Sequence, residues 1–130
     1  MTSNGAVWII AGLEVTAAIG IAVFWVTWFR EDHDQSWLPR GYAAHERVFV
    51  FPDALLAVLL VVSAALLVAE DPLGRALALV GAGMLLFLGI LDAAYFWQTG
   101  LFARERGGRA NAAVVAGVLV LGLVLLVFCA

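Results

Sequence analysis

The chain has 130 residues, of which 65% are hydrophobic and 13% are charged, and its mean hydropathy is +1.04. Soluble domains are nearer a quarter charged, so this composition excludes an ordinary soluble domain and predicts a membrane protein built from one helical bundle. The formal net charge is −3 and no basic run is present, which argues against nucleic acid as a partner. The single cysteine, Cys129, has no second cysteine with which to form a disulfide, a redox pair or a metal pair. No motif indicates a cofactor.

Four apolar stretches are long enough to cross the ~30 Å apolar layer of a bilayer, at about 1.5 Å of helical rise per residue. They cover residues 7–29, 48–68, 76–102 and 110–130. The first is expected to remain in the protein rather than to be cleaved as a signal, because it has no basic residue before it and contains Glu14. Short connections make successive helices antiparallel. The sequence therefore predicts an all-α fold, a single up-down four-helix transmembrane bundle over residues 1–130.

The arginines predict the orientation of this bundle. All seven basic residues are arginine, and only Arg75 lies in the second connection. The first and third connections contain the other six, which are Arg30, Arg40, Arg47, Arg104, Arg106 and Arg109. The positive-inside rule then places these two connections in the cytoplasm and both termini outside the cell's inner (plasma) membrane.

Pro52 lies inside the second stretch. Proline is tolerated at the first helical position and disrupts a helix further along. The regular helix is therefore expected to begin at Pro52, with residues 48–51 forming either a kinked extension or an irregular approach segment.

Three acids lie within or beside the apolar stretches, and they are the main candidates for chemistry. Asp92 is the only charged residue between Ala76 and Phe102, and it should lie roughly 5 Å from the middle of that helix. A carboxylate in an inserted helix costs about 2.5 to 3.5 kcal/mol and usually faces the bundle interior. Glu14 lies toward the outer side of its helix and Asp53 toward the cytoplasm. Together they form a rough ladder of acids, as expected of a proton or cation path.

Helical spacing predicts that the acids share interior faces with other residues. One such face comprises Glu14, Ala17, Ala18, Ile21, Trp25 and Trp28, and another comprises Gly81, Leu85, Leu88, Gly89, Asp92, Tyr95 and Thr99. Each acid also has a structural interpretation. For Asp53 this is a first-turn acid that complements the helix dipole, and for Glu14 it is a watery crevice or a subunit contact. Asp92 would hydrogen-bond to a polar neighbour, namely Tyr95, Gln98, Thr99 or Asn111.

Aromatic side chains near buried acids suggest a site for a lipophilic cation, because carboxylates supply charge and rings supply cation–π attraction. Trp25, Tyr95 and Trp97 are the rings expected to shape such a pocket. The alternative is an aromatic belt at the membrane interface. The first connection contains His33 and His45 among acids, but no ligand pair has a recognised metal-binding spacing, so no metal site is predicted.

Two resemblances concern particular residues. A short four-helix chain with Glu14-Val15 in its first helix resembles the small multidrug resistance transporters, whose essential acid is a glutamate embedded in the first helix. The order Phe24-Trp25, Phe51-Pro52-Asp53 and then residues 91–97 at the end of the third helix is similar to small bacterial membrane proteins of the YvaD type. The first resemblance implies an essential role for Glu14, and the second implies no activity.

Three functional hypotheses follow. The first is a proton- or cation-coupled small-molecule transporter or ligand-binding bundle, acting as a homodimer on a lipophilic cation. The second is a structural or regulatory subunit whose buried acids pair with a membrane partner protein, and the third is an intramembrane lipid-modifying enzyme. The sequence favours a non-enzymatic role. The candidate ligand- or proton-binding residues are Glu14, Asp92, Asp53, Trp25, Tyr95, Trp97, Gln98 and Asn111.

Overall fold

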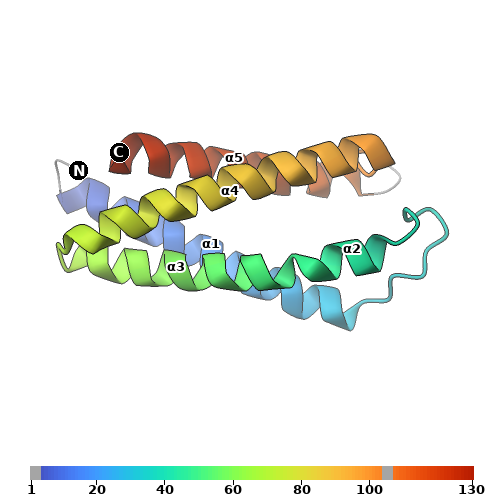
Figure 1. The fold of residues 1–130 in the computed structure, drawn as a ribbon, viewed down its shortest axis with the longest axis horizontal. Coiled ribbons are helices and arrows are strands. Elements are labelled where there is room, and N and C mark those ends of the chain that lie inside the picture. The colour runs from blue at the N-terminus through green and yellow to red at the C-terminus, as the bar shows by residue number, and fades with distance from the viewer. Residues whose placement is uncertain (1–3, 104–106) are drawn as a thin grey trace.

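A computed structural model describes residues 4–103 and 107–130, and within these ranges the chain is helical with no β-strand (Figure 1). The helices are α1 (Asn4–Arg30), α2 (Tyr42–Val48), α3 (Val50–Val68), α4 (Pro72–Thr99) and α5 (Gly108–Cys129). α2 continues almost directly into α3, so the described residues form four long helical segments. All four are long and apolar enough to cross a membrane.

The long helices pack in chain order, α1 against α3, α3 against α4 and α4 against α5. Successive long helices run in opposite directions, which brings the two ends of the chain to the same end of the bundle (Figure 1). The α1–α3 pair and the α4–α5 pair lie close together at that end. They diverge toward the other end, where the connection between α1 and α2 lies.

The helix that contains Pro52 begins earlier than the sequence predicts. α3 starts at Val50, and α2 extends the helical path back to Tyr42, so the segment before the proline is a kinked extension. Phe49 is the joint between them. Its N–H donates to the Glu46 carbonyl oxygen at 2.9 Å, in the tighter pattern of a 3₁₀ turn. Pro52 has no N–H to bond to the carbonyl oxygen four residues earlier. The regular hydrogen-bond pattern of the helix is therefore already interrupted next to this joint.

The second connection is shorter than the predicted turn over residues 69–75. α4 begins at Pro72, because the Asp71 side chain caps the helix by accepting a hydrogen bond from the Leu73 N–H at 2.9 Å. Gly74 is buried against α3, and a Cβ there would lie 2.6 Å from the Leu67 backbone nitrogen. At its other end α4 stops at Thr99 rather than continuing to residue 102, since Gly100 adopts a left-handed conformation with φ 76°.

α4 and α5 are joined by side-chain packing and by an arginine. Glycines allow their close approach: a Cβ on Gly89 would lie 2.7 Å from Leu119 Cδ2. The Arg75 guanidinium donates to the Cys129 carbonyl oxygen and, at 2.8 Å, to a backbone oxygen of Ala130. Arg75 therefore links the first turn of α4 to the end of α5.

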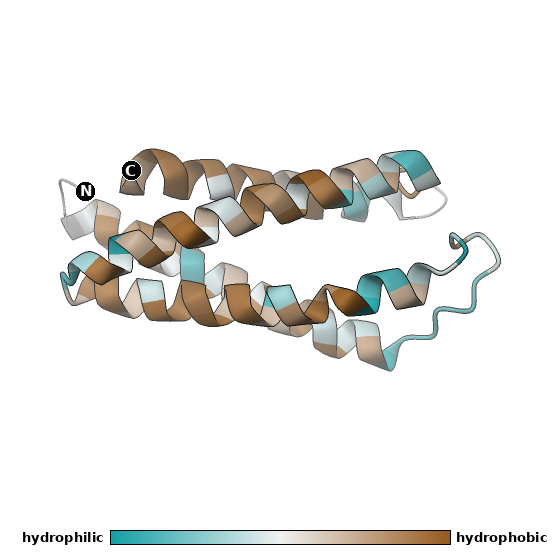
Figure 2. Cartoon of the chain, viewed as in Figure 1, coloured by the Kyte–Doolittle hydropathy of each residue, from teal (hydrophilic) through white to brown (hydrophobic). Residues whose placement is uncertain are grey.

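The outward faces of the helices are apolar (Figure 2). Large hydrophobic side chains lie exposed along the whole length of the bundle, for example Trp8, Val58, Phe87 and Val127. The interior is also apolar and includes Leu56, Leu60, Leu85 and Leu125. A soluble protein rarely exposes so continuous an apolar surface.

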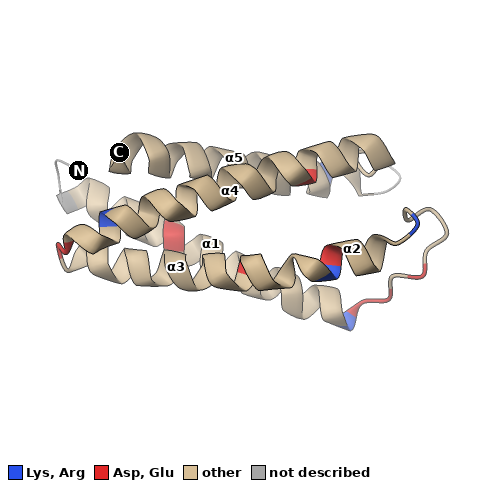
Figure 3. Ribbon diagram, in the orientation of Figure 1, with Lys and Arg blue, Asp and Glu red and all other residues tan. Residues whose placement is uncertain are grey.

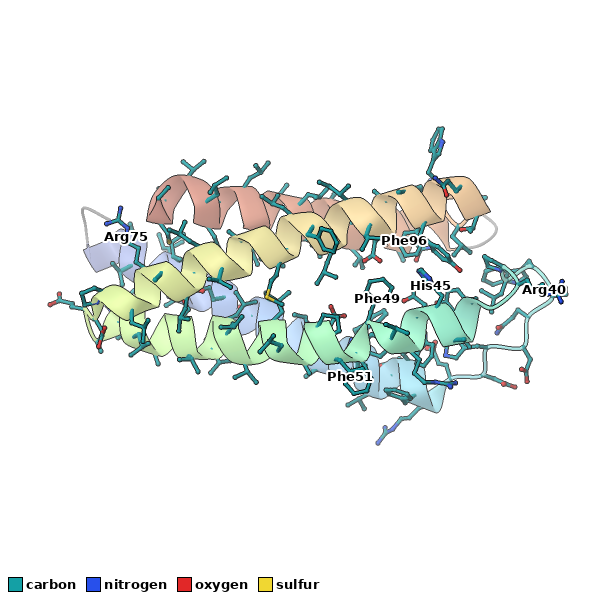
Figure 4. All side chains as sticks on the ribbon, in the orientation of Figure 1. Arg40, His45, Phe49, Phe51, Arg75 and Phe96 are labelled. Atoms are coloured by element: carbon teal, nitrogen blue, oxygen red, sulfur yellow. The ribbon has the colours of Figure 1, made fainter. Side chains whose placement is uncertain are left out.

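Charged residues gather mainly at the two ends of the bundle and in the connection between α1 and α2 (Figure 3). Arg40 lies at the end where the two helix pairs diverge, and Arg75 lies near the other end (Figure 4). Arg30 is the last residue of α1, and Arg47 lies in α2. Arg104 and Arg106, which contributed to the predicted orientation, lie outside the described residues.

Candidate functional site

The space between the two diverging helix pairs contains a cavity of about 350 Å³. Its lining comes from every helix and is mainly apolar. Three carboxylates also line it, and they are Glu46 of α2, Asp53 of α3 and Asp92 of α4. Phe24, Phe49 and Phe96 provide aromatic surface. Phe49 and Phe96 face one another across this space, whereas Phe51 points away from it (Figure 4).

Asp53 is held by a tryptophan of the neighbouring helix. Trp25 Nε1 donates to Asp53 Oδ2 at 2.8 Å, and the Trp25 side chain is only 6% exposed. Asp53 lies in the first turn of α3, where an acid complements the helix dipole. Its N–H nevertheless bonds to the Phe49 carbonyl oxygen at 2.9 Å, so the nearly continuous helix has already satisfied that amide.

Asp92 lies on the cavity wall formed by α4, and two of the polar neighbours proposed for it donate to backbone carbonyl groups. Asn111 Nδ2 donates to the Leu101 carbonyl oxygen at 2.6 Å, although Asn111 also lines the cavity. Thr99 Oγ1 donates to the Tyr95 carbonyl oxygen at 2.6 Å, and Gln98 is exposed. The Asp92 carboxyl group forms part of the cavity lining, on the opposite side of the interior from Asp53 of α3.

Glu46 is a member of this site that sequence reasoning missed, because it was assigned to a solvated connection. It is 6% exposed, and its Oε1 has no hydrogen-bond partner within the described ranges. A helical pattern could have revealed it. Starting from Glu46, alternating steps of three and four residues pass through Phe49, Asp53, Leu56 and Leu60, all on the inner face of α2 and α3.

The electrostatics of the cavity are strongly one-sided. Of the described residues that line it, none is basic, while three carry carboxyl groups. Carboxylates close together in apolar surroundings repel one another, and burying their charge without a partner is costly. Protons or a cationic guest would relieve this cost, and a positive guest would also be attracted to the aromatic rings.

Glu14 lies apart from this cavity. It is fully buried on α1, and neither carboxyl oxygen has a hydrogen-bond partner among residues 4–103 and 107–130. The Ser63 hydroxyl lies beside it but donates to the Gly74 carbonyl oxygen, at 2.9 Å. The cavity lining does not include Glu14. The cavity thus brings Asp53 and Asp92 together, and Glu14 lies outside its lining.

Of the three aromatic residues predicted to shape the pocket, Trp25 contacts a lining residue and Trp97 points away from the cavity. Trp25 does not line the cavity itself but donates a hydrogen bond to Asp53, which does. Tyr95 stacks on His45 with ring centroids 4.0 Å apart and an interplanar angle of 8°. Trp97 is 80% exposed and lies on the outer face of α4. It follows Phe96 by one residue, so the helix turns it away from the cavity.

His33, in the connection between α1 and α2, contacts Trp28 at the end of α1. His33 Nε2 lies 2.8 Å from the Trp28 carbonyl oxygen, and its ring stacks on the Trp28 ring at 4.2 Å. Within the part of the chain that the structure describes, no group of three His, Cys, Asp or Glu side chains is placed to hold a metal ion.

Comparisons with protein family models, with curated proteins and with solved structures found no match.

Proposed function

We propose that the four long helical segments cross the inner (plasma) membrane as an up-down bundle with both termini outside. The apolar outer faces support insertion, because lipid would cover surface that water would not. The arginines of the first and third connections support the orientation.

We further propose that the protein binds a small organic cation in the cavity between its helix pairs. The observation that carries this proposal is the meeting of Glu46, Asp53 and Asp92, from three helices, around an apolar cavity. None of the lining residues within the described ranges offers a positive charge to balance them. A cation with an apolar body fits both features of the lining.

The size of the cavity limits the guest. A volume of 350 Å³ corresponds to about a dozen water-sized groups, at about 30 Å³ each. Benzyltrimethylammonium is a suitable probe of this size, because its fixed charge needs no proton and its ring can pack against phenylalanine. If the guest displaced protons from the same carboxyl groups, its binding would be coupled to proton release. A proton-coupled transporter would need such a coupling.

The test is equilibrium binding of benzyltrimethylammonium to the full chain in lipid discs. We expect saturable binding that Asp92→Asn and Asp53→Asn each weaken by about tenfold or more, the loss for removing one close charge partner. Glu31→Gln is the matched control, because it removes the same charge from an exposed position in the connection. Equal weakening by Glu31→Gln, or no effect of Asp92→Asn, would contradict a specific site.

A further inference from the structure

The walls of the cavity differ in exposure. The wall formed by α3 and α4 is buried, with Leu56 and Leu85 each 2% exposed. The wall formed by α1 and α5 is open, with Phe24 41% and Val114 50% exposed. α1 and α5 are also not among the closely packed helix pairs of the described chain. The cavity therefore opens sideways between α1 and α5, an opening that we call the seam.

Small residues keep the seam unfilled. Gly20 of α1 and Gly117 of α5 both line the cavity, and a Cβ at either position would have no other atom within 4 Å. By contrast, a Cβ on Gly89 would meet Leu119 at 2.7 Å, where α4 and α5 pack closely. The two seam glycines thus border free space.

Polar and apolar lining residues occupy different ends of the cavity. On α4, Asp92 and Leu85 both line it, and they are separated by about 10 Å along the helix axis. On α5 the lining runs from Asn111 to Leu121, about 15 Å. The carboxylates lie toward the connection between α1 and α2, and only apolar side chains lie toward the middle of the bundle.

From this arrangement we infer that the ligand is a single-chain amphiphilic cation. Its charged head lies among Glu46, Asp53 and Asp92, and its alkyl chain lies along the seam between Gly20 and Gly117. In a membrane the seam faces lipid, so such a molecule reaches the site from the bilayer without exposing its chain to water. This inference rests on the proposed function and adds the class of ligand and the place of its chain.

The experiment compares two probes, octyltrimethylammonium and the chain-free tetramethylammonium, by equilibrium binding in lipid discs. Gly117→Leu should fill the seam and weaken binding of the octyl probe by about tenfold, because the leucine side chain and the alkyl chain would compete for the same space. Binding of tetramethylammonium should change less than about twofold. Gly83→Leu is the matched control, since Gly83 is exposed on α4, borders free space and does not line the cavity.

Gly20→Leu, from the opposite helix, should show the same selectivity as Gly117→Leu, so the result does not depend on one variant folding well. Normal binding of the octyl probe by both seam variants would overturn the seam while leaving the acidic site in place. Equal loss of both probes in the seam variants would also overturn it, because filling the seam should spare the head. Unchanged binding of both probes by Asp92→Asn would instead overturn the proposed function.

Discussion

Glu14 is a fully buried carboxyl group on α1 with neither oxygen in a hydrogen bond within the described residues. An ionised carboxylate in such a place is costly, and a neutral group of the same shape costs less. Because the residue lies outside the cavity lining, its contribution should be separable from cation binding.

We therefore expect Glu14→Gln to bind benzyltrimethylammonium as tightly as the wild type, and to unfold thermally at the same temperature or higher. Equilibrium binding in lipid discs would check the first result, and thermal melting followed by circular dichroism in detergent would check the second. If Glu14→Gln lost binding as Asp92→Asn does, Glu14 would belong to the cation site.

Burial on α1 was predictable residue by residue, because one face of a regular helix repeats every three to four positions. Trp25 and Trp28 are 6% and 5% exposed, as the spacing from Glu14 indicates. Hydrogen-bond partners were less predictable. The sequence suggested Asn111 as a partner for Asp92, but the side chain bonds to the Leu101 carbonyl oxygen instead. Partner choice depends on positions of neighbouring helices that periodicity does not specify.

At the scale of the helices, the tight turn between α3 and α4 depends on Gly74. Its missing side chain lets backbone approach backbone: a Cβ would lie 2.6 Å from the Leu67 nitrogen and 2.8 Å from the Leu66 carbonyl carbon. Gly83, on the same helix, borders free space.

Gly74→Ala should lower the free energy of unfolding by about 1 to 3 kcal/mol, because rigid backbone atoms must move to accommodate the methyl group. Gly83→Ala should instead raise it by about 0.5 to 1 kcal/mol, since alanine favours the helix and meets no obstacle. Denaturant unfolding of both variants in detergent micelles would measure the difference. Equal effects of the two substitutions would contradict the close contact at Gly74.

The number of long helices and their approximate positions could be predicted from hydropathy, whereas their boundaries required local detail. The joint at Phe49 and the start of α4 at Pro72 are set by single hydrogen bonds and a capping aspartate. Of the two alternatives for residues 48–51, the structure has the helical extension. The helical path continues through α2, and this also brings Glu46 to the inner face of the helix.

For the whole molecule, the proposed topology places the connection between α1 and α2 on the opposite side of the membrane from the turn between α3 and α4. Two exposed positions can report it, Ser36 in the former and Asp71 in the latter. The native Cys129 is 0% exposed, so it should give little background.

A membrane-impermeant thiol reagent applied to intact cells should label Asp71→Cys, and it should label Ser36→Cys only after the membrane is opened. The physical reason is the arginine bias of the connections, which by the positive-inside rule favours the first and third on the cytoplasmic side. The reverse labelling pattern would show that the orientation is inverted, and labelling of both positions in intact cells would contradict membrane insertion.

Antiparallel order followed from the short connections, but the cavity did not follow from any feature of the sequence. Its existence depends on the divergence of the α1–α3 and α4–α5 pairs and on α1 and α5 remaining apart. Those are relations between distant segments. Periodicity identifies which face of each helix points inward, and it does not show how closely two inward faces approach.

Whether the carboxyl groups of the cavity hold an organic cation can be measured by infrared difference spectroscopy of the protein in lipid. Adding benzyltrimethylammonium should change the carboxyl and carboxylate bands of the wild type, and part of that change should disappear in Asp92→Asn. Carboxyl bands that stay unchanged at saturating cation, or a change that Asp92→Asn leaves intact, would contradict the claim.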